Sequence, residues 1–60
     1  MYYFTAEYIN MDTDEVIQRA IKFDGQFLQN EAECFIYAMR KAYEMKADNE
    51  LLSKVEFIAC

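Results

Sequence analysis

The sequence predicts a small α+β domain of the ββαβ type, with a three-stranded antiparallel sheet and one helix packed on one face. Three observations predict this fold. The chain begins and ends with segments whose apolar residues alternate, and a segment with helical apolar spacing lies between them. A chain of 60 residues has room for a single domain, residues 1–60. A hydrophobic content of 55%, with 17% aromatic residues, suits a core this small.

The first predicted element is a strand over residues 2–9. Aromatic and β-branched residues dominate it, and the apolar period is two. One side carries Tyr2, Phe4, Ala6 and Tyr8, and the other carries Tyr3, Thr5, Glu7 and Ile9.

The second element, residues 15–23, fits two structures. As a strand it places Ile17, Ile21 and Phe23 on one face, and Arg19 falls on that same apolar face unless a bulge shifts the register. As a helix it gathers Val16, Ile17, Ala20 and Ile21 into one stripe, which Gly25 would end. Its β-branched residues favour the strand. A helix would also leave only two strands, which are weak in isolation.

The third element is a helix over residues 31–47. Its residues are good helix formers, and Asn30 is a suitable N-cap. An apolar stripe at helical spacing is expected to face the sheet, formed by Phe35, Ala38, Met39, Ala42 and Met45. Tyr37 is expected to project from the polar side.

The last element is a strand over residues 52–59, where Val55, Phe57 and Ala59 alternate with Lys54, Glu56 and Ile58. A hairpin around residues 11–14 would join the first two strands. A right-handed crossover through the helix then gives the strand order 2-1-3, with residues 2–9 in the middle.

Composition argues against several classes of protein. The net charge is −5, from 11 acidic and 6 basic residues, which disfavours binding to nucleic acid or to anionic membranes. The N-terminal residues do not resemble a signal peptide, and no apolar run reaches the roughly 18 residues of a membrane span. We therefore expect a cytoplasmic protein whose two thiols, Cys34 and Cys60, are reduced.

The residues needed for common catalytic and metal chemistry are absent. There is no histidine, Gly25 is the only glycine, and two cysteines without histidine cannot complete a zinc site. The acidic cluster Asp12, Asp14 and Glu15 is interpreted as turn chemistry rather than as a cation site. Cys34 is interpreted as a buried, inert thiol. We expect no enzyme, no cofactor and no bound metal.

The sheet face away from the helix is the predicted interaction surface, because one helix covers only one face. Aromatic and β-branched side chains on an open face are typical of interfaces. The predicted interface residues are Tyr3, Thr5, Glu7, Ile9, Val16, Ala20, Tyr37 and Ile58. The edge strands are a further possibility, since the last strand could pair with its copy.

The sequence therefore indicates a non-catalytic protein-interaction domain that binds another protein or itself as a homodimer. The alternative is an acidic inhibitor that occupies the nucleic-acid groove of a basic protein. Its carboxylates would be those near the ends of elements, namely Asp12, Asp14, Glu15, Asp24, Glu31, Glu33, Asp48 and Glu50. An enzyme with paired carboxylates is the weakest hypothesis, since no two acids have an evident reason to share a desolvated pocket.

Overall fold

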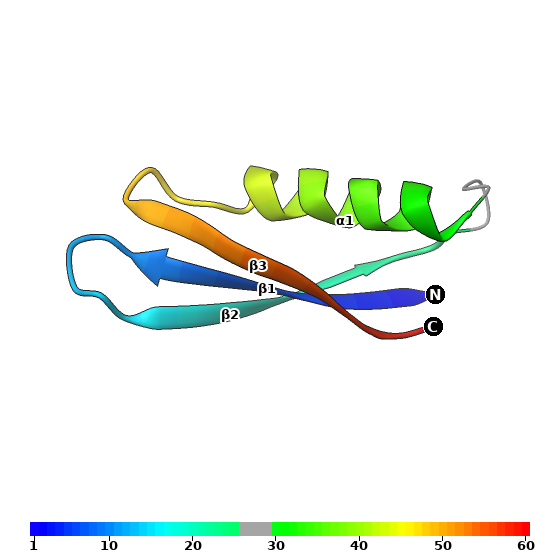
Figure 1. Ribbon diagram of the computed structural model, residues 1–60, viewed down its shortest axis with the longest axis horizontal. Helices are drawn as coiled ribbons and strands as arrows, with labels where there is room; N and C mark the ends of the chain where they lie inside the picture. The colour runs from blue at the N-terminus through cyan, green and yellow to red at the C-terminus, as the bar shows by residue number, and fades with distance from the viewer. Residues whose placement is uncertain (26–29) are drawn as a thin grey trace.

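The computed structural model describes residues 1–25 and 30–60. Its elements are β1 (Tyr2–Asn10), β2 (Val16–Phe23), α1 (Glu31–Glu44) and β3 (Glu50–Ala59). The strands form one antiparallel sheet in the order β2-β1-β3, and α1 lies along one face of it (Figure 1). The predicted fold class and strand order are confirmed. The molecule is elongated, with extents of 38 × 18 × 14 Å.

The ambiguous second segment is a strand. It pairs with β1 without a register shift, from Tyr2 opposite Phe23 to Ile9 opposite Val16. Because the pairing is continuous, no bulge moves Arg19 off the apolar face, and Arg19 lies opposite Ala6 on the side that α1 covers. Arg19 therefore does lie on the apolar face of the sheet, as the strand pattern places it.

The core lies between the sheet and α1. The sheet contributes large side chains, and the helix contributes small ones that let the two backbones approach. The buried residues are Phe4, Ala6, Tyr8, Ile21 and Phe23 from the strands and Cys34, Ala38 and Ala42 from the helix. The aromatic rings stack within this layer, with 5.8 Å between the centroids of Phe4 and Phe23.

The buried line of α1 differs from the predicted stripe. Cys34, Ala38 and Ala42, each four residues apart, face the sheet, whereas Phe35 and Met45 are partly exposed. The helix turns its smallest side chains toward the aromatic sheet and moves its larger ones to the flanks. The predicted polar placement of Tyr37 is wrong, because its ring packs on Phe23 with the centroids 4.6 Å apart.

The ends of α1 follow local hydrogen bonding. Asn30 is the N-cap as predicted, and its side chain accepts a hydrogen bond from the Glu33 amide at 2.9 Å. The helix ends at Glu44 rather than at the predicted residue 47. The Ala47 amide instead donates to the Glu50 carboxylate at 2.9 Å, which draws the chain into a turn. β3 accordingly begins at Glu50, ahead of the predicted start at residue 52.

The β1–β2 turn accounts for part of the acidic cluster. The Asn10 side-chain oxygen accepts hydrogen bonds from the amides of Asp12 and Thr13, at 2.8 and 3.2 Å. Asp14 has a φ of 63°, a conformation that Asp tolerates better than most residues. These geometries agree with the interpretation of this cluster as turn chemistry.

Candidate functional site

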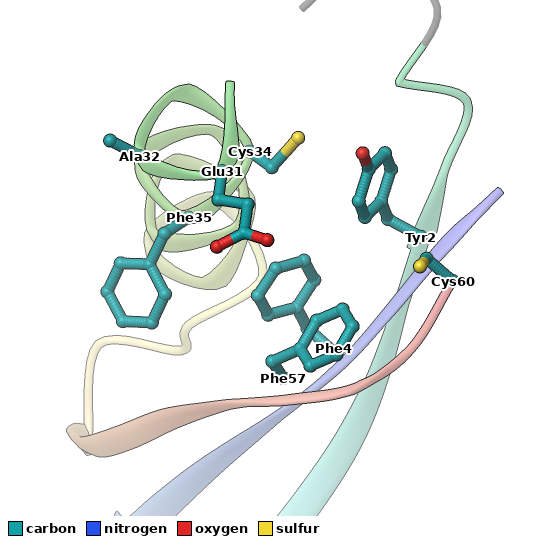
Figure 2. A pocket seen from close by; sticks show the side chains of 8 residues that line it. All are labelled: Tyr2, Phe4, Glu31, Ala32, Cys34, Phe35, Phe57 and Cys60. Atoms are coloured by element: carbon teal, nitrogen blue, oxygen red, sulfur yellow. The ribbon is translucent and has the colours of Figure 1, made fainter.

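An open groove lies at the end of the helix–sheet layer where α1 begins (Figure 2). Its volume is about 440 Å³. Side chains from β1, α1, β3 and the C-terminal residue line it, namely Tyr2, Phe4, Glu31, Ala32, Cys34, Phe35, Phe57 and Cys60.

Three phenylalanines define the apolar part of this groove. Phe4 is buried at its floor, whereas Phe35 is 43% exposed and Phe57 is 50% exposed. The centroid of Phe4 lies 6.2 Å from that of Phe35 and 5.5 Å from that of Phe57, both in edge-to-face arrangements. Glu31 and Ala32, which also line the groove, are exposed. Large apolar side chains that are exposed together in one groove are a feature of many interaction sites, so the groove is the candidate site.

The polar groups of the groove are few. The Glu31 carboxylate points over the rings from the first turn of α1 (Figure 2). The thiol of Cys34 is buried and that of Cys60 is exposed. A hydrogen bond with Cys34 raises the pKa of the Tyr2 hydroxyl, which stays neutral at physiological pH. This is an apolar groove with one charge at its mouth.

The groove lies beside the outer edge of β3. The strand order leaves β3 at one edge of the sheet, and Phe57 comes from this strand. Of residues Leu51–Ala59, all are exposed except the half-buried Leu52 and Val55. An exposed strand edge beside an apolar groove is the geometry in which a protein segment is bound as an added strand.

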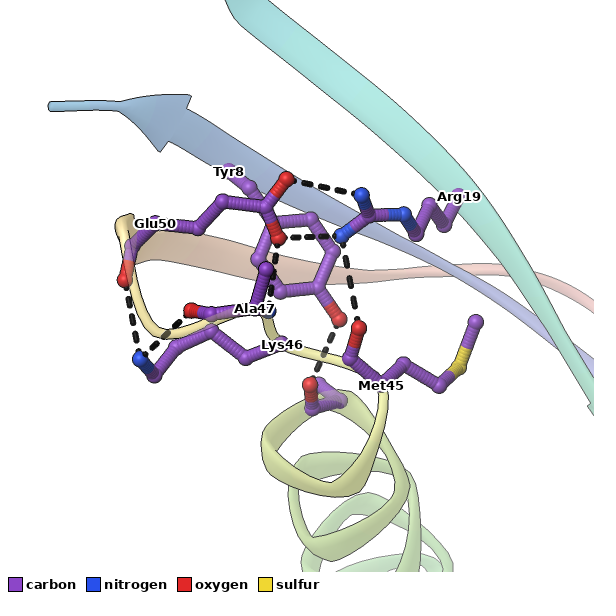
Figure 3. A network of polar contacts seen from close by, with 7 residues as sticks. Tyr8, Arg19, Met45, Lys46, Ala47 and Glu50 are labelled. Atoms are coloured by element: carbon purple, nitrogen blue, oxygen red, sulfur yellow. Dashed lines mark hydrogen bonds and ion pairs between the residues drawn. The ribbon is translucent and has the colours of Figure 1, made fainter. Parts of the chain in front are cut away.

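The opposite end of the layer, where α1 ends, is closed by a polar network (Figure 3). Two guanidinium nitrogens of Arg19 donate to the Glu50 carboxylate at 2.6 and 2.7 Å. Glu50 is only 4% exposed, and its hydrogen bonds from Arg19 and from the Ala47 amide lower its pKa to about 2. The same bond to Glu50 raises the pKa of Arg19. The pair is therefore charged at any ordinary pH.

Tyr8 connects this ion pair to the helix. Its hydroxyl donates to the Ala42 carbonyl oxygen at 2.6 Å, and the Arg19 guanidinium lies 4.6 Å from its ring centroid. Burial raises the pKa of Tyr8. Within the described residues, no buried side-chain nitrogen or oxygen lacks a hydrogen-bond partner. The buried polar groups of the network are thus satisfied within the chain.

The predicted interface residues are only partly brought together. Tyr3, Thr5, Glu7 and Ile9 do share the face away from α1, with Ala20 opposite Thr5 and Val16 opposite Ile9. Ile58 lies at a register shift at the end of β3. Tyr37 is on the other side of the sheet, against Phe23.

The apolar surface of this open face is divided. Val16, Ile9 and Leu51 form one row across the strands at the turn end, and Tyr3 lies near the other end. Between them lie charged and polar residues, including Glu7 opposite Lys54 and a 3.4 Å hydrogen bond from Gln18 to Glu7.

The sequence does not predict the groove or the polar network, which lie at the two ends of the helix–sheet layer. The apolar patterns place Phe35 and Phe57 in the core, but Ala32, Phe35, Ile36, Met39 and Tyr43 form a second apolar stripe on the helix that signals an excess. The signal for the network is Arg19 on an apolar face, which requires a buried acid. The sequence does not indicate which acid.

No metal site or membrane helix is found in residues 1–25 and 30–60. No group of three His, Cys, Asp or Glu residues there could hold a metal ion, and no helix has the length and apolarity to cross a membrane. Comparisons with protein-family models, with curated proteins and with solved structures found no match.

Proposed function

We propose that this chain is a non-catalytic protein-interaction domain that binds an extended protein segment in the groove between α1 and β3. The observation that carries the proposal is the pair of half-exposed rings, Phe35 and Phe57, beside the exposed edge of β3. Aromatic side chains around a desolvated pocket are the usual energetic centre of a protein interface.

The binding mode follows from the geometry of the edge. A segment paired with β3 would receive main-chain hydrogen bonds along the strand, and every second side chain would point into the groove. Those side chains would be apolar where they meet Phe4, Phe35 and Phe57. A basic side chain near the mouth would complement Glu31.

The groove is a better candidate than the open sheet face. In the groove the ring centroids of Phe35 and Phe57 lie 6.2 and 5.5 Å from that of the buried Phe4. On the open face, Glu7 and Lys54 separate the apolar row at Ile9 from Tyr3. Desolvating those charges would oppose binding there.

A peptide selection tests the proposal. The full chain would be immobilised at low density, so that copies do not meet, and random displayed peptides would be selected against it. We expect extended peptides with alternating apolar residues, whose binding shifts the NMR amide signals of β3 and of the first two turns of α1. Phe57→Ser should abolish this binding.

The matched control is Val16→Ser, which removes an exposed apolar side chain from the open face and should leave peptide binding unchanged. The proposal would be contradicted by peptides that shift the amide signals of the Val16, Ile9 and Leu51 row, or by peptides that still bind the Phe57→Ser variant.

An acidic inhibitor is the second candidate function. The Met11 amide donates to the Asn49 carbonyl at 2.8 Å, and the Asn49 side chain donates to Asp12 at 3.0 Å. These bonds hold the β1–β2 turn beside the α1–β3 loop at one end of the molecule (Figure 1). The turn carries Asp12, Asp14 and Glu15, and the loop carries Asp48.

The remaining element-end acids weaken this second candidate, because Asp24 follows the end of β2, and Glu31 and Glu33 lie in the first turn of α1, at the other end of the layer. Its test is displacement of labelled DNA from a panel of basic DNA-binding proteins at rising salt. An inhibitor of this kind should lose its effect steeply as salt increases. No displacement at low salt would eliminate it.

A further inference from the structure

We infer that the groove and the edge of β3 are occupied by a second copy of this chain, with the two β3 strands antiparallel about a two-fold axis at Val55. The inference rests on the proposed function, because it names the partner of the same surface. It is carried by the charges on β3.

Lys54 and Glu56 project on the sheet face away from α1. In the register with β1, Lys54 lies opposite Glu7 and Glu56 lies opposite Thr5. Neither takes part in the ion pairs found among the described residues, which are Arg19–Glu50 and Lys41–Glu44. Both charges are therefore available to a strand on the outer edge.

A two-fold pairing about Val55 uses both charges. Residues 54 and 56 then lie directly opposite one another across the two copies. Lys54 of each copy meets Glu56 of the other, so the pairing contains two opposite-charge contacts. Such directly opposed pairs stabilise an antiparallel sheet.

The neighbouring two-fold registers do not offer this. If both helices are to lie on the same face of one continuous sheet, the two-fold axis must pass beside one residue of β3, and that residue then lies opposite the same residue of the second copy. Centring the axis on residue 54 would place Lys54 against Lys54, and centring it on residue 56 would place Glu56 against Glu56. Like charges directly opposed are destabilising, so the charges select the register at Val55.

The edge of β2 lacks the same complementarity. Its charged residues are Arg19 and Lys22, and the strand Val16–Phe23 contains no acid. Arg19 is also committed to Glu50. Charges often protect an edge against pairing. The charges on β2 are both positive and would oppose pairing with a second copy of β2. The charges on β3 have opposite signs and would favour pairing with a second copy of β3.

The other face of the same register accounts for the exposed ring of Phe57. Val55 would contact its own copy on the side that carries α1, and Phe57, two residues further along the same face, would lie diagonal to Val55 of the second copy. Diagonal neighbours in a sheet are within reach of an aromatic ring. Phe57, now half exposed, would be covered. The product is a six-stranded sheet with both helices on one face.

The test is a charge reversal followed by mixing. Sedimentation equilibrium over a dilution series would be measured for the unchanged chain, for Lys54→Glu and for Glu56→Lys. Each variant alone has like charges in both inter-copy contacts, and we expect its dissociation constant to rise at least about tenfold. An equal mixture of the two variants has opposite charges in both contacts and should regain the dimer.

Two controls keep the result interpretable. Lys22→Glu reverses one charge on β2 and should leave the dimer unchanged. Lys54→Glu also places a carboxylate opposite Glu7 of its own chain, so circular dichroism and urea unfolding would show whether each variant is folded. Glu56→Lys, opposite Thr5, carries no such risk and suffices alone for the charge argument.

A folded wild-type chain that stays monomeric across the series would overturn the inference, as would a dimer indifferent to both reversals or a mixture that does not associate. None of these results would remove the proposed function if selected peptides still bind beside Phe57. Loss of peptide binding beside Phe57 together with an intact β3 dimer would leave the second copy as the sole occupant of the groove.

Discussion

The two ends of one helix–sheet layer differ in how they are completed. Where α1 ends, Tyr8, Arg19 and Glu50 form a buried network in which each polar group has a partner within the chain. Where α1 begins, Phe35 and Phe57 stand half exposed around the buried ring of Phe4. The first end needs nothing from outside, whereas the second exposes apolar surface. Under the proposed function, one end of the layer contributes mainly to stability and the other end to binding.

Replacing Arg19 should have the largest effect on stability, because it disrupts the closed end of the layer. Arg19→Met leaves the Glu50 carboxylate buried without its partner, which is far more costly than losing an exposed charge. We expect it to lower the midpoint of urea unfolding more than Ala38→Leu, which overpacks the core. Lys22→Met on the exposed side of the same strand is the control, and its midpoint should stay close to that of the unchanged chain.

The double variant Arg19→Met/Glu50→Leu separates the ion pair from packing. Replacing both members of a buried pair by apolar side chains is often close to neutral. We expect it to recover much of the stability lost by Arg19→Met. A double variant no more stable than the single one would contradict the role given to the unpaired charge.

Acid should weaken the closed end in a defined range. The pKa of Glu50 is lowered to about 2 by Arg19 and the Ala47 amide, against 4.5 for the unperturbed group. A lowered folded-state pKa stabilises the protein above the unfolded value, and that stabilisation is lost as pH falls toward the folded one. Urea unfolding should show stability declining from about pH 5 to pH 2. Glu50→Gln should remove this part of the decline, and an identical slope would contradict it.

Two alanines on α1 allow the packing of the core to be compared with the packing of the groove. Ala38 is fully buried between helix and sheet, and Ala32 is exposed at the groove. Ala38→Leu should cost about 1–3 kcal/mol by overpacking. Ala32→Leu should leave the free energy of unfolding within about 0.5 kcal/mol, as surface substitutions usually do. Equal losses would mean that the groove is as tightly packed as the core.

The elements themselves follow from local patterns. The period of two in residues 2–9, the Asn30 cap and the alternation around Val55 each depend on near neighbours, and the structure contains the corresponding strands and helix. The rotation of α1 does not, because apolar residues surround much of the helix. Only the aromatic sheet opposite decides that Cys34, Ala38 and Ala42 face inward.

The two ends depend on pairings across long stretches of chain. Arg19 signals a missing acid, but Glu50 is 31 residues away, and the chain holds several other acids. Phe35 and Phe57 have the spacing of core residues, since a sequence does not show how much of a ring its neighbours leave uncovered. Such features come from tertiary packing, which periodicity alone does not specify.

The most direct test follows the NMR amide signals of the chain on dilution from millimolar to micromolar concentration. We predict that signals of β3 and of the first two turns of α1 change, while those around Tyr8 and Arg19 and in the β1–β2 turn stay constant. Changes centred on Val16 and Ile9 would contradict this prediction, because association would then use the open sheet face.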